Sequence, residues 1–172
     1  MPKLDDAELA AFLDEPGHLV RIGTVDGDGM PRVTPTWFVH HAGAILFTPR
    51  SESVFLANLR RDDRVALLVD ETALPYRKVN VAGRAELLHD LGDDDAWRDR
   101  YREIAMRYIE PDAAEAYIQA TIDQPRALLG VTLAGASVTS WRMPVGDEDG
   151  TGIWARRYYA EGTKMARRAD EA

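Results

Sequence analysis

The stretch HLVRIGTVDGDGMPRVTPTWFV, residues 18–39, decides the fold because its side-chain pattern has a period of two. Asp26-Gly27-Asp28-Gly29 divides it, and these residue types tolerate the positive φ angles of a tight turn. The stretch therefore predicts a β-hairpin with strands at 18–25 and 31–39. The second strand is expected to present two sets of side chains on opposite faces: Val33, Pro35, Trp37 and Val39 on one, and Arg32, Thr34, Thr36 and Phe38 on the other. Pro35 indicates an edge strand or a bulge.

Similar strand patterns recur beyond the hairpin. Further strands are expected at 44–48, 64–69, 78–88 and 127–141, with a turn at His40-His41-Ala42-Gly43 and a bulge at Gly83. Helices are expected at 4–15, where Asp5 and Glu8 have capping-box spacing, at about 53–60, and at 93–122 with a break near Pro111. Six short strands with inserted helices predict a mainly β (α+β) fold, a small barrel with helical additions.

Length and composition limit the classes of function. The chain has 172 residues and no repeat or linker, so we expect one domain over 1–172 with a polar C-terminal extension at 143–172. Its net charge is -8 and it has no long basic block, which argues against a nucleic-acid partner. It has no cysteine, no signal-peptide pattern and no apolar run of about 20 residues, so we expect a cytoplasmic protein without a membrane partner.

Several catalytic motifs are missing from the sequence. There is no GxGxxG after a strand, no Walker loop, no HExxH and no serine-hydrolase elbow. His40 and His41 are adjacent, so on a strand they would point to opposite faces, and no third ligand has a plausible spacing. We therefore expect no metal site.

The segment FTPRSESVF, residues 47–55, has two interpretations. In the simpler one, Ser51 or Ser53 caps the helix that follows and Arg50 is a solvated surface charge. In the other, the helix N-terminus, the hydroxyl groups and the arginine bind a phosphate. The polar residues of 32–36 and the cations of Tyr76-Arg77-Lys78 are expected to line the same pocket in that case.

The ordered motifs PRVTPTWF, ILFTPR, SxxxLxNLRRDxRV and PYRKVxVxGRAEL resemble the pyridoxamine 5'-phosphate oxidase-like superfamily of flavin-binding proteins over about residues 5–142. The likeness is greatest to an actinobacterial branch that includes enzymes using the deazaflavin coenzyme F-420 in place of FMN. This resemblance implies a six-stranded antiparallel split β-barrel with peripheral helices. It also implies a homodimer that binds two cofactors at the subunit interface.

The resemblance also implies roles for particular residues. Carried over by position, the cofactor contacts are Thr34, Pro35, Thr36 and Trp37 beside the flavin ring, Phe47 and Thr48 along the same wall, Arg50, Ser51 and Ser53 at the phosphate, Arg77 and Lys78 at the ring edge, and Trp141 from the partner subunit. Two departures stand out. Val54 and Phe55 occupy positions where the family often has a cation, so the grip on phosphate falls to Arg50 or to a distant cation such as Arg77. The segment 140–144 lacks the histidine of true pyridoxamine phosphate oxidases, which argues against that substrate.

The sequence thus predicts an FMN- or deazaflavin-dependent oxidoreductase acting on a small organic molecule. Its catalytic residues are unknown; Tyr76 is a candidate proton donor, although its interpretation as a packing residue at a strand end is favoured. A non-catalytic flavin- or haem-binding dimer of the same fold is an alternative, and so is a structural or stress-related dimer without cofactor. The aromatic and basic tail at 151–168 is interpreted as a lid, a nucleotide-stacking segment or a dimer-packing extension.

Overall fold

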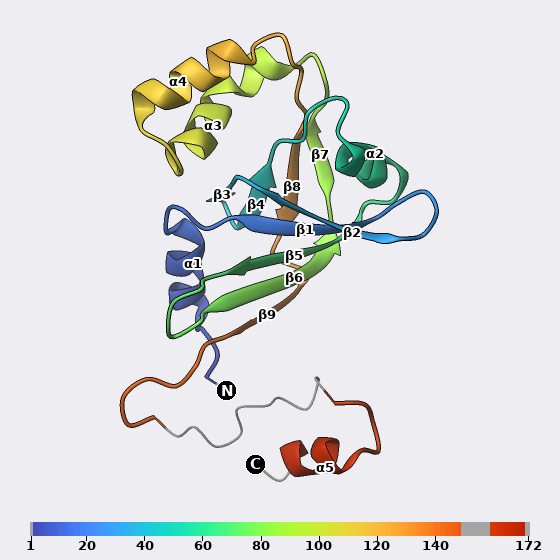
Figure 1. Ribbon diagram of the computed structural model, residues 1–172, viewed down its shortest axis with the longest axis vertical. Helices are drawn as coiled ribbons and strands as arrows, with labels where there is room; N and C mark the ends of the chain where they lie inside the picture. Colours follow the sequence, from blue (N-terminus) through green and yellow to red (C-terminus); the bar gives the residue numbers. More distant parts are fainter. Residues whose placement is uncertain (1, 149–158, 171–172) are drawn as a thin grey trace.

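The computed structural model describes residues 2–148 and 159–170, and its core is two antiparallel β-sheets packed against each other (Figure 1). The five-stranded sheet has the order β2-β1-β5-β6-β9 and the four-stranded sheet has the order β3-β4-β8-β7. The strands are β1 (Val20–Val25), β2 (Pro31–Thr36), β3 (Phe38–His41), β4 (Ala44–Phe47), β5 (Arg64–Asp70), β6 (Lys78–Arg84), β7 (Glu86–His89), β8 (Leu128–Thr132) and β9 (Ser137–Trp141). The helices are α1 (Asp6–Asp14), α2 (Val54–Arg61), α3 (Asp94–Met106), α4 (Pro111–Ala120) and α5 (Lys164–Asp170). The mainly β (α+β) barrel is therefore confirmed.

The start of α1 is fixed by its own sequence. The Glu8 amide donates to the Asp5 carboxylate at 2.8 Å, and the Asp5 amide donates to the Glu8 carboxylate at 2.9 Å. This reciprocal pair is the expected capping box, and it satisfies N–H groups that the first helical turn cannot pair internally. Phe12 and Leu13 then carry α1 onto the barrel, where both are fully buried.

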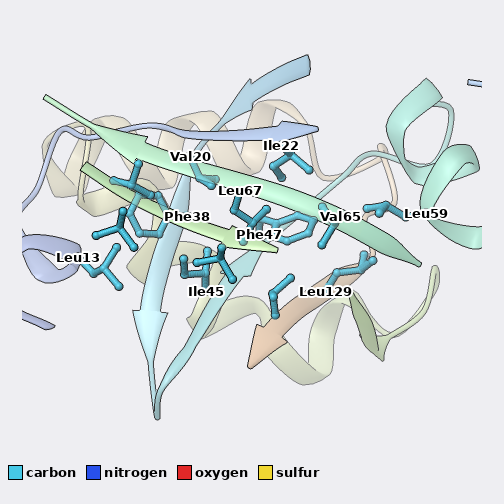
Figure 2. Close-up of a cluster of buried hydrophobic side chains, with 14 of the residues drawn as sticks. Leu13, Val20, Ile22, Phe38, Ile45, Phe47, Leu59, Val65, Leu67 and Leu129 are labelled. Atoms are coloured by element: carbon cyan, nitrogen blue, oxygen red, sulfur yellow. The ribbon is translucent and has the colours of Figure 1, made fainter. Parts of the chain in front are cut away.

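The main core lies between the two sheets (Figure 2). β1 contributes Val20 and Ile22, while β5 contributes Leu67 and Val69, always from alternate positions. The four-stranded sheet contributes Phe38, Ile45, Phe47, Leu129 and Val131 to the same core. Period-two alternation thus produces the core directly, because every second residue of each strand faces inward. None of the helices among the described residues is long and apolar enough to cross a membrane.

Residues 2–148 and 159–170 form nine strands where six were expected, because three predicted strands are interrupted. The predicted strand 31–39 ends at Thr36, and Phe38 starts β3 in the other sheet. Trp37, at the break, leaves the barrel and stacks on Tyr108 at 5.1 Å between ring centroids. Likewise 78–88 divides into β6 and β7, and 127–141 divides into β8 and β9 around Gly135, which has a φ of 87°.

Two local predictions were wrong. His40 and His41 belong to β3, and the turn is made by Ala42 and Gly43, whose φ angles are 49° and 74°. Gly83 causes no bulge: it pairs with Val65 in an unbroken register. An added Cβ there would meet Val131 at 3.2 Å, so the glycine permits a close approach between the two sheets.

A helical excursion separates β7 from β8. The two strands are paired neighbours, yet the chain between them forms α3 and α4, which lie together beyond one end of the sheets in Figure 1. A second buried cluster forms where this excursion meets β3, β4 and β8, and it contains Val39, Leu46, Trp97, Tyr101, Ile104, Ile118 and Leu128, with Trp37 and Tyr117 at its border.

The outer face of the five-stranded sheet carries small side chains. Across one row, Val33, Gly23, Ala66, Ala82 and Ser137 are in register on neighbouring strands. Val33 is 67% exposed, and a shallow hollow of about 1090 Å³ lies over this row. This outer row is flat and largely apolar, in contrast to the charged residues that surround it.

Candidate functional site

The segment before α2 borders a hollow of about 580 Å³. Its lining residues are Arg50, Ser51, Glu52, Ser53, Asp123, Gln124 and Pro125. The Ser51 amide donates to the Pro125 carbonyl at 2.9 Å, and Arg50 forms a β-bridge with Arg126, so the segments before α2 and before β8 run side by side. Pairing of the two segments therefore sets the shape of the hollow.

Ser53 stands at the N-cap of α2, as one interpretation of the sequence expected, but its side chain does not cap the helix. Its hydroxyl donates to the Arg50 carbonyl at 2.7 Å instead. No side chain among the described residues thus accepts from the first-turn N–H groups of α2, and the positive end of the helix dipole is left for another acceptor. Glu52 and Asp123 line the same hollow, so Arg50 is the group that makes it suitable for an anion.

Two arginines converge on one tyrosine next to this hollow. The Tyr117 hydroxyl accepts from an Nη of Arg50 at 3.0 Å and from an Nη of Arg126 at 3.1 Å. Arg126 is only 6% exposed, and its guanidinium lies 4.6 Å from the centroid of the Tyr101 ring. Its other polar contact is with the Thr48 carbonyl at 3.4 Å. We call Arg50, Arg126 and Tyr117 the arginine–tyrosine cluster.

Tyr101 and Tyr117 differ in the direction in which their surroundings shift their pKa values. Burial raises the pKa of Tyr117, but hydrogen bonds from Arg50 and the proximity of Tyr101 and Arg126 outweigh it, so the pKa lies below its usual value. Burial raises the pKa of Tyr101 far above its usual value, with only partial opposition from the charge of Arg126. The Tyr101 hydroxyl is near Tyr117 but is buried without a hydrogen bond of good geometry. Tyr117 is thus the more acidic of the pair.

Part of the predicted flavin wall adjoins this cluster. Trp37 stacks on Tyr108 with an interplanar angle of 6° and meets the Tyr117 ring edge-on, with centroids 5.4 Å apart. Thr48 is buried, and its carbonyl contacts Arg126. The structure therefore brings Trp37, Thr48 and Arg50 together, with Tyr117 and Arg126 as the connecting residues.

Other predicted contacts lie elsewhere on the barrel. Thr34 and Thr36 are half-buried on the edge strand β2, opposite Ile22 and Val20, whereas Pro35 faces outward and is exposed. The Phe47 side chain is 0% exposed in the core, so only its main chain is able to border a cofactor. The expectation that Phe47 continues the flavin wall therefore stays a prediction that concerns its main chain.

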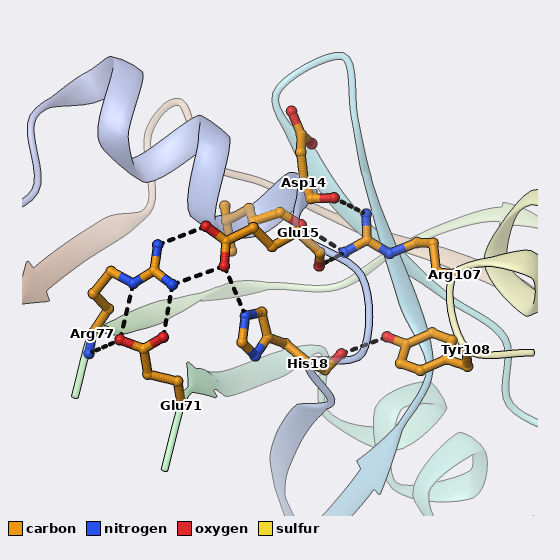
Figure 3. A network of polar contacts seen from close by, with 8 residues as sticks. Asp14, Glu15, His18, Glu71, Arg77, Arg107 and Tyr108 are labelled. Carbon is orange, nitrogen blue, oxygen red and sulfur yellow. Dashed lines mark hydrogen bonds and ion pairs between the residues drawn. The ribbon is translucent and has the colours of Figure 1, made fainter. Parts of the chain in front are cut away.

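Arg77 is committed to an ion-pair network (Figure 3). Its guanidinium donates to both oxygens of Glu15, at 2.6 and 2.8 Å, and to both oxygens of Glu71, at 2.9 and 2.7 Å. It also lies 4.6 Å from the centroid of the Phe12 ring. Arg77 therefore ties α1 to the β5–β6 connection within one chain, and its suggested contribution to phosphate binding stays a prediction.

The same network contains a group of possible metal ligands. Ligand atoms of Glu15, His18 and Glu71 lie within 4.8 Å of one another. Arg77 bonds both carboxylates, however, and the His18 ring is 3.3 Å from Glu15. The guanidinium supplies the positive charge that a metal ion would bring, so these residues are explained as a structural network. His40 and His41 have separate partners, Asp14 and Arg100.

Lys78 and Trp141 begin β6 and end β9, and they are directly paired. The Lys78 ammonium lies 3.9 Å from the centroid of the Trp141 ring, a cation–π contact. The Trp141 indole N–H is buried without a hydrogen-bond partner among the described residues. Tyr76, just before them, is exposed with a φ of 57°, so its ring does not pack in the barrel.

The twelve predicted contacts thus separate into groups within one chain. The residues that line the hollow before α2 include none of Arg77, Lys78 and Trp141 in the described part of the molecule. The expectation that residues 32–36, 48–53 and 76–78 line one pocket was wrong for a single chain; Arg32, for example, pairs with Asp26 at 2.7 Å. Of the tail at 151–168, residues 151–158 lie outside the described residues, and its predicted function stays a prediction.

Sequence reasoning missed Tyr117 and Arg126. Both lie in a region that was interpreted only as helix and strand, and no local motif marks either residue. A usable signal was present: Arg126 directly precedes an apolar strand, and the region 93–122, expected to be helical, carries Tyr101, Tyr108 and Tyr117. Only the pairing of two segments far apart in sequence turns these residues into a cluster.

Comparisons with known proteins give a consistent result. The family model described as pyridoxamine 5'-phosphate oxidase matches residues 5–140. The crystal structure of conserved hypothetical protein Rv2991 from Mycobacterium tuberculosis superposes with a TM-score of 0.66 at 24% identity, covering 86% of this chain and 93% of that one. A structure described as F420 reductase gives 0.55 at 25% identity, covering 80% and 98%. HutZ, a haem storage protein from Vibrio cholerae, gives 0.59 at 18% identity, covering 80% and 96%, which shows the fold alone. No curated protein sequence matches the chain.

Proposed function

Because the chain belongs to the pyridoxamine 5'-phosphate oxidase family, we propose that it is a homodimeric oxidoreductase that uses a flavin or deazaflavin cofactor on a small organic substrate. The relative described as F420 reductase supports redox chemistry with a deazaflavin, and FMN is the alternative cofactor. Pyridoxamine phosphate is not the proposed substrate, since Trp141-Arg142-Met143-Pro144 contains no histidine.

The observation that carries this proposal is the uncapped start of α2. Ser53 turns its hydroxyl to the Arg50 carbonyl, so the first-turn N–H groups of α2 have no side-chain acceptor. Arg50 borders the same hollow. Backbone donors, a helix dipole and a guanidinium together are the set that binds phosphate in proteins. The residues present therefore fit the phosphate of a flavin-type cofactor.

Positions 54 and 55, where the family often has a cation, hold uncharged residues in this chain. Phe55 is buried in the barrel core and Val54 is exposed, so neither side chain serves the phosphate. Phosphate binding then depends on Arg50, with Ser51 and Ser53 as further hydrogen-bond donors. We infer that FMN binds more weakly here than at a site with two cations, which favours a cofactor with further contacts along its tail.

The cofactor supplies hydride or electron transfer when it is bound. The chain supplies position, charge and exclusion of water. Trp37 offers an aromatic edge that Tyr108 and Tyr117 hold in place. Lys78 provides a cation at the end of the five-stranded sheet. In the proposed homodimer, Lys78 of one subunit would contribute to the cofactor site of the other. That arrangement requires the homodimer, because one chain does not bring Lys78 to the Arg50 hollow.

The decisive experiment is an absorption spectrum of protein purified from a host that makes both FMN and the deazaflavin. We expect one of the two chromophores to copurify, and we expect it to be reduced and then reoxidised when donor and acceptor are added. A bound chromophore that does not turn over would support the non-catalytic binding dimer. Purified protein without any chromophore, and without uptake of added flavin or deazaflavin, would contradict the proposal.

A further inference from the structure

The arginine–tyrosine cluster has an excess of positive charge. Arg50 and Arg126 each direct an Nη at the Tyr117 hydroxyl, at 3.0 and 3.1 Å. No carboxylate contacts either guanidinium in the described part of the chain. Asp94 is close, but its carboxylate accepts from the Arg126 backbone amide at 2.9 Å. A neutral phenol would leave two cations side by side around a single weak acceptor.

Burial makes this arrangement costly for Arg126. The residue is 6% exposed, and its Nε is buried without a hydrogen-bond partner among the described residues. Buried guanidinium groups are ordinarily paired with an anion, because the desolvation of an unpaired charge is unfavourable. The Tyr101 ring face offsets part of this cost through a cation–π contact at 4.6 Å. The Arg126 guanidinium therefore keeps a donor, its Nε, that has no partner among the described residues.

We propose that Arg50, Arg126 and Tyr117 form a binding site for one small oxyanion, a phosphate or carboxylate group, and that the Tyr117 hydroxyl ionises to take the place of this anion when the site is empty. The inference rests on the proposed function for the source of the oxyanion, which is either the cofactor or the substrate. Forked guanidinium groups favour such ligands because two parallel N–H groups match two oxygens. Arg50 is exposed and borders the hollow, so it gives the oxyanion access.

Proton uptake on binding follows from this exchange. The ligand and the Tyr117 phenolate compete for the same N–H groups, so binding of the oxyanion returns a proton to Tyr117. The pKa of Tyr117 is already below its usual value in the empty site, and an oxyanion would raise it. Below that pKa the affinity is independent of pH, and above it the affinity falls about tenfold per pH unit, as linkage of one proton requires.

The charged and titratable groups around Tyr117 come from every element packed against it: Arg50 and Glu52 before α2, Asp94 and Tyr101 on α3, Asp123 and Arg126 before β8, and Tyr108 after α3. Burial holds the pKa values of Tyr101 and Tyr108 above the usual value. Both phenols therefore stay neutral while Tyr117 titrates.

Sulfate is the best probe because its charge is constant across the whole titration. Full-length protein without bound chromophore is titrated from about pH 7 to beyond the ordinary tyrosine pKa of about 10, and the near-ultraviolet tyrosinate absorbance is followed with and without sulfate. We expect an early tyrosinate transition that sulfate moves to higher pH. Tyr117→Phe should lack this transition, whereas Tyr76→Phe, which removes an exposed phenol elsewhere, should retain it.

Calorimetry with sulfate tests the arginines. Arg50→Gln should weaken sulfate binding roughly ten- to a hundredfold, the effect of losing a hydrogen bond to a charged group. Arg60→Gln is the matched control, since Arg60 pairs with Asp90 at the other end of α2, and it should bind sulfate like the wild type. Tyr117→Phe should still bind sulfate but lose the decline at high pH. Acetate in place of sulfate distinguishes a carboxylate site from a phosphate site.

Two results would overturn the inference: sulfate binding that is unchanged in Arg50→Gln, or an early tyrosinate transition that sulfate does not move. Neither depends on a flavin. A protein that binds sulfate with proton uptake but takes up no flavin or deazaflavin would retain this site and lose the proposed function.

Discussion

Arg50 belongs both to the hollow before α2 and to the arginine–tyrosine cluster, so a single substitution tests which cofactor group it contacts. Arg50→Ala should weaken binding of FMN roughly ten- to a hundredfold, because one charge-assisted hydrogen bond contributes about 1.5–3 kcal/mol. Riboflavin lacks the phosphate, so its affinity should hardly change. Fluorescence titration of both ligands measures the difference. Arg60→Ala serves as the control, and an equal loss for FMN and riboflavin would show that Arg50 does not bind phosphate.

Gly130 lies where the packed side chains of neighbouring strands leave little room for a Cβ atom. A Cβ at this position in β8 would lie 2.9 Å from Leu46 Cδ2 and 3.2 Å from Leu88 Cδ1. Gly130→Ala should lower the free energy of unfolding by about 1–3 kcal/mol, as overpacking usually does. Gly27→Ala is the control, because its nearest neighbour would be a flexible arginine end at 3.7 Å. Denaturant unfolding of both variants gives the comparison, and equal stability would mean that the two leucines move aside freely.

At the scale of elements, Arg77 holds α1 against the barrel, and this contact depends on pH. Hydrogen bonds from Arg77 lower the pKa values of Glu15 and Glu71 against the opposing effect of burial. Carboxyl groups with a lowered folded pKa stabilise the protein above their unfolded pKa of about 4.3, and this stabilisation is lost as the pH falls toward the folded value. Arg77→Gln should therefore destabilise the protein by about 1–3 kcal/mol at pH 7, after allowance for partial exposure.

The difference between Arg77→Gln and the wild type should shrink when unfolding is measured near pH 3 in place of pH 7, because the wild type has then lost most of the same interaction. Arg64→Gln is a suitable comparison. Its ion pair with Asp62 is largely exposed, so little change is expected at neutral pH. An Arg77→Gln defect that is as large at pH 3 as at pH 7 would mean that Arg77 acts through packing on Phe12 alone.

Structural features that depend only on residues close together in the sequence were predictable. The capping box of α1 and the hairpin turn at 26–29 follow from neighbouring residues, and the structure agrees with both. α2 begins where it was expected, although Ser53 does not cap its first turn. Interruptions of strands were not predictable, since Trp37 leaves the barrel only because Tyr108 and Tyr117 are there to receive it. The same limit applies to the site: Arg77 looked available until Glu15 and Glu71 met it from distant segments.

At the scale of the whole molecule, we expect the partner subunit of the proposed homodimer to cover the outer face of the five-stranded sheet. Ala66 lies at its centre with Gly23 and Ala82 on either side, and Val33 is largely exposed. Ala66→Arg should shift the protein from dimer to monomer in light scattering at low concentration, since a buried unpaired charge opposes association. Ala57→Arg, on an exposed position of α2, should remain dimeric. A wild-type monomer would refute the dimer and any cofactor shared between subunits.

β7 ends at His89 and β8 begins at Leu128, yet the two strands are adjacent in one sheet. The intervening excursion therefore leaves and re-enters the barrel at neighbouring points, and its length has little effect on the stability of the strand pairing, since each doubling of a loop costs only about 0.6 kcal/mol. It carries Tyr101 and Tyr117, and its last residues deliver Arg126 to the site. Under the proposed oxyanion site, recombination of one contiguous gene segment would change the ligand that a lineage accepts while the barrel is inherited intact. For engineering, the same two points are where an excursion from a relative would be grafted to transfer its specificity.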